Sequence, residues 1–312
     1  MTSSSSALEP QAGADGSFSL YSSGFGEGFH SPRGARTEAR TTFVEPAELA
    51  AHPAPLLTVV DVCFGLGYNS AALLEALPPA GLSLDWWGLE LDRRPLELAL
   101  AQPAFRRQWS APVLRVLEQL RSGSGWEGPQ GHGRMLWGEA RRHLAEVEQA
   151  RSGRCHLLFM DAFSPRHCPE LWTAEFLQRL ARLLAPQGRL ITYCSAAAVR
   201  NALAQAGLHL AAIRAPAQPE GAGGRAWSQG TVASPSPLPS SRRLRPLSAM
   251  EREHLQTRAA EPYRDPSQAA SAAEILASRE RAQARSGAPS TGSWRRRWGL
   301  EHRRVDGPGH AT

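Results

Sequence analysis

The sequence contains no lysine, so all 35 of its basic residues are arginines. This absence excludes a Schiff-base lysine and the phosphate-binding lysine of P-loop proteins. The arginines are also unevenly spread, because residues 238–312 carry 14 Arg and 8 acidic residues, whereas residues 1–237 carry 21 basic and 21 acidic residues. The net charge of +6 therefore lies entirely in the C-terminal tail.

Cysteine is scarce, with 4 residues, and none of them forms a C-x-x-C pair. We therefore expect neither a disulfide framework nor a bound metal. Long apolar runs are also absent, since none approaches the roughly 18–20 residues that a membrane helix needs. Residues 1–16 lack the basic start and apolar core of a secretory signal. We expect a soluble, cytoplasmic protein without membrane contact.

Strand-like and helix-like segments alternate along the middle of the chain. Strands are predicted at 56–62, 83–91, 134–138, 155–163 and 188–195, followed by an antiparallel pair at 208–215 and 230–234. Helices are predicted at about 70–77, 95–100, 105–121, 170–184 and 196–207. This alternation is typical of a doubly wound α/β fold, with a mostly parallel sheet between helices and an antiparallel terminal pair.

Composition divides the chain into three parts. Residues 1–16 are rich in Ser, Ala and Gly and are expected to be disordered. Residues 17–234 are expected to form a single domain, whose first segment, 17–45, has aromatic and charged residues but little periodicity. Residues 235–312 are interpreted as an Arg-rich linker and tail, partly helical over 248–285 and otherwise largely disordered.

A glycine-containing loop follows the first predicted strand. Glycine lets a ligand approach the backbone closely, and the free N–H groups at the next helix start bind anions. The dinucleotide fingerprint would place a third glycine where this chain has Ser70, so an ordinary tight turn stays open as an alternative. The candidate ligand-binding residues of this segment are Asp61, Gly65, Gly67 and Asn69.

Carboxylates end the next three predicted strands. Glu90 lies 23 residues after Gly67, where an acidic residue commonly binds ribose hydroxyls. Gly138 and Glu139 end the third strand, where an acid can face an adenine amino group; a plain surface glutamate is the alternative. Asp161 ends a very apolar strand, at the edge where open α/β sheets bind ligands. Because a carboxylate there loses hydration, Asp161 is the candidate catalytic residue.

The loop after Asp161 contains two prolines and ends at an aromatic residue. Phe163 and Trp172 are candidates to stack on a base or to wall a pocket, and Pro165 belongs to the same candidate substrate loop. For Trp172 the alternative is a buried position between helix and sheet.

These motifs together resemble the methyltransferase domain of the MnmC-like tRNA (5-methylaminomethyl-2-thiouridine) methyltransferases, over roughly residues 17–234. The most specific part is the Asp-x-Phe-x-Pro-x-x-x-Pro-x-x-Trp pattern from Asp161 to Trp172. Cys63 departs from the family, which usually has Gly or another small residue there. The N-terminal segment also resembles the part that precedes this domain, through Phe25, Gly34, Glu38, Arg40 and Phe43.

The resemblance implies a Rossmann-like fold that binds S-adenosylmethionine and methylates the 5-aminomethyl group of the wobble uridine in tRNA. Gly65 and Gly67 would approach the methionine moiety, and Glu90 the ribose. Glu139 would lie near the adenine, and Asp161 beside the acceptor amine. The flavin oxidoreductase domain of some family members is not expected, because the chain has no second G-x-G-x-x-G. Further substrate contacts are implied for Phe25, Glu38 and Arg40.

Several alternatives stay open. The Arg-rich tail is either a contact for RNA phosphates or a solvated extension without a role. The domain could instead methylate a small-molecule or protein amine, act as an aminopropyltransferase of the spermidine-synthase kind, or be a catalytically silent RNA-binding protein. The Phe-x-Pro…Trp loop argues against the aminopropyltransferase, and Asp161 with the glycine pair argues against the silent protein.

Overall fold

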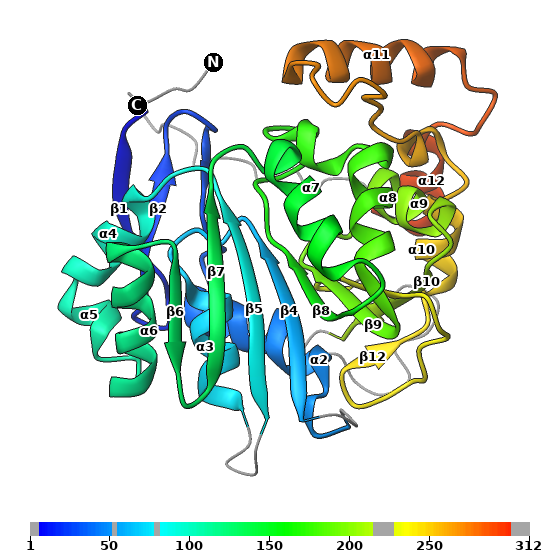
Figure 1. Cartoon of the computed structure of the whole chain (residues 1–312). Helices are drawn as coiled ribbons and strands as arrows, with labels where there is room; N and C mark the ends of the chain where they lie inside the picture. Colours follow the sequence, from blue (N-terminus) through cyan, green and yellow to red (C-terminus); the bar gives the residue numbers. More distant parts are fainter. Residues whose placement is uncertain (1–5, 52–54, 78–81, 215–227, 301–312) are drawn as a thin grey trace, which may run out of the picture.

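The computed structural model describes residues 6–51, 55–77, 82–214 and 228–300. Within these ranges the chain forms one large sheet with helices on both faces and a small sheet beside it (Figure 1). The strands of the large sheet are β4 (Leu56–Val62), β5 (Ser83–Glu90), β6 (Gly125–Gly128), β7 (Gly131–Trp137), β8 (Cys155–Met160), β9 (Leu184–Thr192), β10 (His209–Ile213), β11 (Thr231–Ser234) and β12 (Leu244–Arg245).

The strand order of this sheet is β12-β10-β11-β9-β8-β4-β5-β7-β6. Neighbouring strands from β9 to β7 pair in parallel, whereas β6, β10, β11 and β12 pair antiparallel with their neighbours. The doubly wound fold and the antiparallel pair β10–β11 are therefore confirmed. In the described part of the chain, no helix is long and apolar enough to cross a membrane.

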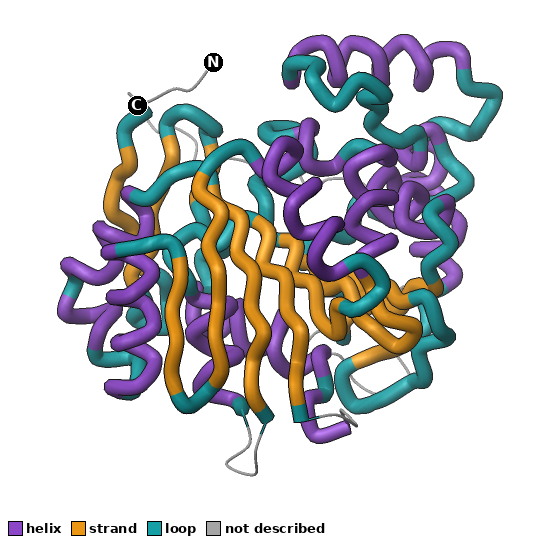
Figure 2. The backbone as a smooth tube through the Cα atoms, in the orientation of Figure 1, coloured by secondary structure: helices purple, strands orange, loops and turns teal. Residues whose placement is uncertain are grey.

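Helices cover the sheet on both sides, as Figure 2 shows. They are α1 (Ala35–Glu38), π-helix η1 (Ala39–Val44), α2 (Glu45–Ala47), 3₁₀ helix η2 (Leu49–Ala51), α3 (Tyr68–Ala76), α4 (Arg94–Ala101), α5 (Pro103–Arg106), α6 (Ala111–Ser122), α7 (Ala140–Arg151), 3₁₀ helix η3 (Pro169–Trp172), α8 (Ala174–Leu183), α9 (Ala197–Gln205), α10 (Ala249–His254), 3₁₀ helix η5 (Arg258–Ala260), α11 (Ala272–Arg285) and α12 (Thr291–Trp298).

Successive side chains of each strand point to opposite faces of the sheet, and a separate hydrophobic core lies on each face. Val59 and Trp86 pack with the N-terminal segment, α3, α4 and α6. Their sequence neighbours Val60 and Trp87 point the other way and pack with α7, α8 and α9. Successive strand side chains face opposite sides, so these near-continuous apolar runs match strands that are buried on both faces.

The strand predicted at 134–138 corresponds to β7, but its first residues and its antiparallel hairpin partner β6 were missed. Glycines are frequent between residues 122 and 133 and hide the strand character of this stretch. One of them is required by packing, because a Cβ on Gly133 would lie 2.0 Å from the indole nitrogen of Trp126. The helix α7 was also not predicted.

The expected disorder of residues 1–16 is wrong for the part that the structure describes; residues 1–5 lie outside the described residues. β1 (Leu8–Ala12), β2 (Phe18–Ser22) and β3 (Glu27–Gly28) form a three-stranded antiparallel sheet. β1 is largely exposed and polar, so its order comes from backbone pairing with β2, whose Leu20 is fully buried. Composition alone cannot reveal such an edge strand.

The expectation that the C-terminal tail is largely disordered is also wrong for residues 235–300, whereas residues 301–312 lie outside the described residues. α10 and α12 lie beside α9, whereas α11 lies at the top of the view and contacts η3 (Figure 1). The Arg-rich segment of α12 carries Trp294, which is 4% exposed, stacks on His254 at 4.1 Å and donates a hydrogen bond to the carbonyl of Met250. The arginines between Trp294 and Trp298 face solvent. This exposure explains why the segment has a composition that is typical of disordered chains.

A buried ion cluster fastens the tail to α9. Arg200 and Glu251 are each 1% exposed, and their charged atoms lie 3.2 Å apart, while Arg245 lies 2.6 Å from the other carboxylate oxygen. Burial by itself would raise the pKa of Glu251, but the hydrogen bond from Arg245 and the charge of Arg200 lower it to about 2. The carboxylate therefore stays charged and paired, and breaking the cluster would leave a buried charge uncompensated.

Replacing Trp294 by Ala is expected to weaken the packing of α12 on α10 by about 3–5 kcal/mol, the usual cost of removing a buried Trp. Hydrogen exchange should then speed up in α10 and α12, with the central strands unchanged. Trp298→Ala is the matched control, because that side chain is only partly buried and donates one hydrogen bond to Glu253. Full protection of α12 in Trp294→Ala would contradict this view of the tail.

Candidate active site

The predicted site residues meet at one edge of the sheet. β8, β4, β5 and β7 are adjacent and parallel, so the segments that follow them lie side by side at their carboxyl ends. These segments hold the glycine loop after β4, Glu90 at the end of β5, Glu139 after β7 and Asp161 after β8. The structure therefore brings together four chemical features that are far apart in the sequence.

The glycine loop folds back onto the end of β5. Cys63, Gly65 and Gly67 have φ angles of 65°, 58° and 90°. At Gly67 a Cβ would lie 2.7 Å from the Phe64 ring, so glycine is required by packing as well as by conformation. Cys63 adopts the same left-handed region at some conformational cost, which explains why a glycine is usual at its position.

Glu90 connects the loop to β5. Its Oε2 accepts a hydrogen bond of 2.7 Å from the N–H of Gly65, and its Oε1 accepts one of 2.9 Å from the N–H of Asp92. Burial raises the pKa of Glu90 despite these hydrogen bonds. The next residue, Leu91, is 50% exposed although it is large and apolar, and the sequence interpretation missed it. A carboxylate beside an exposed apolar side chain suits a nucleoside, whose ribose is polar and whose base is flat.

Two predicted cofactor ligands have supporting positions instead. Asp61 is fully buried beneath the loop, where its Oδ2 accepts from Ser70, and burial raises its pKa to about 7. Asn69 is 7% exposed, and its side-chain amide donates a 2.7 Å hydrogen bond to Asp161. Both side chains hold their neighbours in this way, and direct contact of Asp61 and Asn69 with the cofactor stays a prediction.

Asp161 is held from two directions. Its Oδ2 accepts the hydrogen bond from Asn69, and its backbone N–H donates to the carbonyl of Val62 at 3.1 Å. Burial raises the pKa of Asp161 well above its usual value, and the nearby negative charge of Glu38 raises it further. The Glu38 carboxylate itself accepts a 2.9 Å hydrogen bond from the N–H of Ser31, and its expected contact with the substrate stays a prediction.

Aromatic side chains from the N-terminal segment and from the loop after β8 form a wall above the glycine loop. Phe25 stacks on Phe163 with ring centroids 4.4 Å apart, and Phe29 meets Phe163 edge-on at 4.9 Å. Phe29 also lies over the glycine loop, because a Cβ on Gly65 would be 3.5 Å from its ring. Phe29 was not predicted; the aromatic spacing of the N-terminal segment was the available signal.

Two aromatic residues, the buried Trp172 and the partly buried Tyr193, hold the loop that carries Phe163. Trp172 is fully buried and donates a 2.8 Å hydrogen bond from its indole nitrogen to the Phe163 carbonyl. Tyr193 donates a 2.9 Å hydrogen bond to the Ala162 carbonyl and meets Trp172 edge-on at 6.3 Å. The expectation that Trp172 stacks on a base is therefore wrong, because its ring has no exposed face. Pro165 is buried in the same loop.

The loop is also tied to the N-terminal segment. The N–H of Ser164 donates a 2.8 Å hydrogen bond to Glu27, and the Nδ1 of His167 contacts the Phe25 carbonyl. Arg40 does not join this contact. Its exposed guanidinium lies 3.2 Å from Glu45, so its expected role at the substrate is not supported by the geometry.

Glu139 forms the N-cap of α7 beyond the end of β7. Its Oε1 accepts from both the backbone N–H of Arg141 and the Nε of the same residue, at 3.2 and 2.9 Å. The preceding Gly138 has a φ of 140°, and a Cβ there would lie 2.6 Å from the ring of His143. Its N–H donates to the carbonyl of Glu90 at 2.8 Å. The carboxyl group of Glu139 therefore lies next to the strand that ends in Glu90.

Replacing Tyr193 by Phe is expected to lower kcat/KM for methyl transfer about 3–10-fold, the effect of one lost neutral hydrogen bond. Burial raises the pKa of Tyr193, so its hydroxyl stays protonated and is a donor to Ala162. Steady-state kinetics measured alongside cofactor binding would check this. Cofactor affinity should stay unchanged, because Tyr193 acts on the loop that carries Phe163; a loss confined to cofactor affinity would refute the assignment.

The edge fits S-adenosylmethionine. A Cβ on Gly65 would meet only the Phe29 ring at ordinary contact distance, 3.5 Å, among side chains, and Glu90 with Leu91 offers a polar and an apolar contact side by side. The described residues contain no group of three or more His, Cys, Asp or Glu side chains that could hold a metal ion.

Comparison with known proteins agrees with this geometry. Residues 126–219 match a family model described as S-adenosyl-L-methionine-dependent methyltransferase. The bifunctional protein MnmC of tRNA 5-methylaminomethyl-2-thiouridine biosynthesis from Aeromonas hydrophila is 28% identical over 216 residues, 62% of this chain and 31% of that protein. MnmC from Pseudomonas paraeruginosa is 30% identical over 197 residues, 59% of this chain and 30% of that protein. This chain thus spans less than a third of the length of these relatives.

The crystal structure of MnmC2 from Aquifex aeolicus is similar over most of both molecules. It superimposes with a TM-score of 0.72 and 28% sequence identity, covering 88% of this chain and 85% of that one. The Rossmann-like fold, the S-adenosylmethionine cofactor and the resemblance inferred from the motifs are confirmed by these similarities.

Proposed function

We propose that the chain is an S-adenosylmethionine-dependent methyltransferase of the MnmC type and that it methylates the amine of a 5-aminomethyl group on the wobble uridine of tRNA. The observation that carries the proposal is the aromatic wall formed by Phe25, Phe29 and Phe163, together with the Asp161 carboxylate that Asn69 holds two residues before Phe163. A carboxylate suits an amine, and the aromatic rings suit a flat base. A tRNA substrate also agrees with the cytoplasmic location expected from the sequence.

The carboxylates perform the proton chemistry. S-adenosylmethionine supplies, when bound, a methyl group that is already activated on a sulfonium. An alkylammonium must lose a proton before its nitrogen can attack, and Asp161 accepts that proton. Its raised pKa brings the carboxylate closer to the amine in proton affinity. Asn69 fixes the acceptor oxygen, and Glu38 attracts the cationic form of the substrate. Alignment of the two reacting groups supplies the rest of the acceleration.

The aromatic wall holds the base in this proposal. The rings of Phe25 and Phe163 are each partly exposed, and they come from segments that a hydrogen bond between Glu27 and Ser164 ties together. Stacking of a base on an aromatic side chain contributes about 1–3 kcal/mol and needs a nucleotide displaced from its neighbours. The wall therefore selects a base that is turned out of the anticodon loop.

The C-terminal segment adds basic residues to the same edge of the molecule. Figure 1 shows α11 beyond the carboxyl ends of the central strands, on the side where the site lies. Arg264, Arg281 and Arg285 are exposed there, as is Arg166 in the loop after β8. We assign these arginines to contacts with tRNA phosphates, which would supply the charge that the neutral remainder of the chain lacks.

Replacing both Arg281 and Arg285 by Gln is expected to weaken tRNA binding and to reduce the slope of log K against log salt by roughly 0.7–0.9 per lost phosphate contact. Fluorescence anisotropy at several salt concentrations would measure this. Arg154→Gln is the matched control, because Arg154 is exposed at the opposite, amino-terminal end of β8. An unchanged slope in the double variant would show that α11 does not contact the RNA.

The enzymatic proposal is tested with methyl-labelled S-adenosylmethionine and tRNA from cells that lack the gene. After digestion, mass spectrometry should find the label in a 5-methylaminomethyl uridine, and Asp161→Ala should abolish it. Cofactor binding without label in any nucleoside would reject tRNA as the substrate and direct the search to a small-molecule or protein amine.

A further inference from the structure

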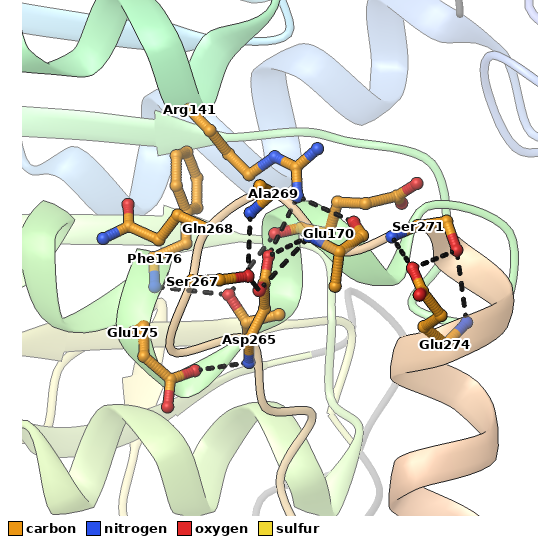
Figure 3. A network of polar contacts seen from close by, with 12 residues as sticks. Arg141, Glu170, Glu175, Phe176, Asp265, Ser267, Gln268, Ala269, Ser271 and Glu274 are labelled. Carbon is orange, nitrogen blue, oxygen red and sulfur yellow. Dashed lines mark hydrogen bonds and ion pairs between the residues drawn. The ribbon is translucent and has the colours of Figure 1, made fainter.

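The side chain of Arg141 connects the cofactor edge of the sheet with the C-terminal segment. It is 13% exposed, and Figure 3 shows its guanidinium directed at the segment that contains Asp265. Its Nε donates to Glu139 at 2.9 Å, and its Nη1 donates to Asp265 and to the carbonyl of Ala270, both at 3.0 Å. Asp265 lies 124 residues further along the chain, so this contact is a tertiary link and not a local feature of α7.

Asp265 is a fixed acceptor. Its side chain is 1% exposed and accepts hydrogen bonds from the hydroxyl of Ser267 at 2.7 Å and from the N–H of Ala270 at 3.3 Å. Burial disfavours its charged form, but these hydrogen bonds and the charge of Arg141 outweigh burial and lower the pKa of Asp265. It is therefore a charged, ordered partner for the guanidinium.

The backbone around Asp265 is anchored to α8. The N–H of Asp265 donates to Glu175 at 2.8 Å, and the carbonyl of Tyr263 accepts from the N–H of Ala174 at 2.9 Å. Arg279 lies over the Tyr263 ring at 4.4 Å and adds a contact from α11. The segment thus has a defined position relative to α8, and Asp265 transmits that position to Arg141.

The guanidinium in turn orients Glu139. Both contacts from Arg141 reach the same oxygen, Oε1, and the carboxyl group is 34% exposed. The side chain is thereby held in one orientation while part of the carboxyl group faces solvent. Arg141 forms ion pairs with both Glu139 and Asp265, so its positive charge is balanced by two carboxylates. Without that second carboxylate, Glu139 would be the main counter-charge of a poorly hydrated guanidinium and a weaker acceptor for any ligand.

We propose that Asp265 and Arg141 are positioning residues that orient the Glu139 carboxylate to accept a hydrogen bond from the 6-amino group of the cofactor adenine. The inference rests on the proposed placement of the adenine beside Glu139. It makes the C-terminal segment, which lies outside the matched range 126–219, a part of the cofactor site. Selectivity for adenine over a base with a 6-oxo group then depends on a residue at the far end of the chain.

Calorimetric binding of S-adenosylhomocysteine and its deaminated analogue S-inosylhomocysteine tests this directly. The analogue has an acceptor in place of the 6-amino donor, so the unmodified protein should bind it at least about 10-fold more weakly, as expected for one charged hydrogen bond. Glu139→Gln should reduce that preference, because its amide is a weaker acceptor. Asp265→Asn and Arg141→Gln should reduce it to a similar extent, and Asp265→Asn added to Glu139→Gln should change it no further.

Glu280→Gln is the control, because Glu280 is an exposed carboxylate of α11 outside the contacts argued above. It should retain the preference, and thermal unfolding of every variant separates loss of fold from loss of selectivity. If Asp265→Asn and Arg141→Gln keep the full preference for S-adenosylhomocysteine while Glu139→Gln loses part of it, the positioning role is overturned. The placement of the adenine beside Glu139 would then still hold. No preference in the unmodified protein would instead overturn the placement of the adenine beside Glu139.

Discussion

Replacing Asp161 by Asn is expected to lower kcat for methyl transfer about 10²–10⁴-fold, the range for loss of a general base. Asn keeps the shape of the side chain and can still contact Asn69, but it cannot accept a proton from the substrate amine. Single-turnover rates measured with saturating cofactor would show the loss, and calorimetry should show nearly unchanged cofactor affinity. A rate within experimental error of the unmodified enzyme would assign the proton to another acceptor.

The pH dependence of Asp161 follows from its surroundings. The pKa of this carboxyl is raised by burial and by the negative charge of Glu38, so kcat/KM should fall as the pH decreases through a value above that of an ordinary aspartate. Glu38→Gln removes the neighbouring charge and stabilises the ionised form of Asp161. The acidic limb of the profile should therefore move to lower pH in this variant. If the acidic limb of the kcat/KM profile does not move, a group other than Asp161 controls the pH dependence.

Replacing Glu90 by Ala is expected to raise the dissociation constant for S-adenosylmethionine about 10–100-fold, the usual cost of losing a hydrogen bond to a charged group. The change removes the proposed ribose acceptor and also leaves the N–H of Gly65 without its acceptor. Isothermal titration would measure the effect. Glu97→Ala is the matched control, since Glu97 is exposed on the first turn of α4. Equal affinities of the two variants would argue against cofactor contact at Glu90.

The part of the site that follows from strand order was predictable. β4 has the predicted bounds, Leu56–Val62, and Glu90 and Asp161 end strands whose apolar runs stand out. Because parallel strands place their carboxyl ends at one edge, knowing the strands was enough to bring these carboxylates to the glycine loop. This inference needed only local patterns and one general rule of sheet topology.

The direction of individual side chains was not predictable in the same way. Trp172 and Phe163 are aromatic residues of one loop, yet Trp172 is fully buried and Phe163 is partly exposed. Asn69 follows the glycine loop like a cofactor ligand, and its amide donates to Asp161, just after β8. The tail appeared disordered because its order depends on surfaces of α8 and α9 that are distant in sequence. Each error concerns a tertiary contact, which composition and periodicity do not encode.

The long reach of the contact between Arg141 and Asp265 has a consequence for how the protein matures. Synthesis proceeds from the N-terminus, and domains begin to fold while the rest of the chain is still being made. The strands from β4 to β11 are complete before residue 265 leaves the ribosome, so the guanidinium of Arg141 meets its C-terminal partner only near the end of translation. The link between α7 and the C-terminal segment therefore forms late in biogenesis, and a nascent chain that stalls before residue 265 has an Arg141 without this partner.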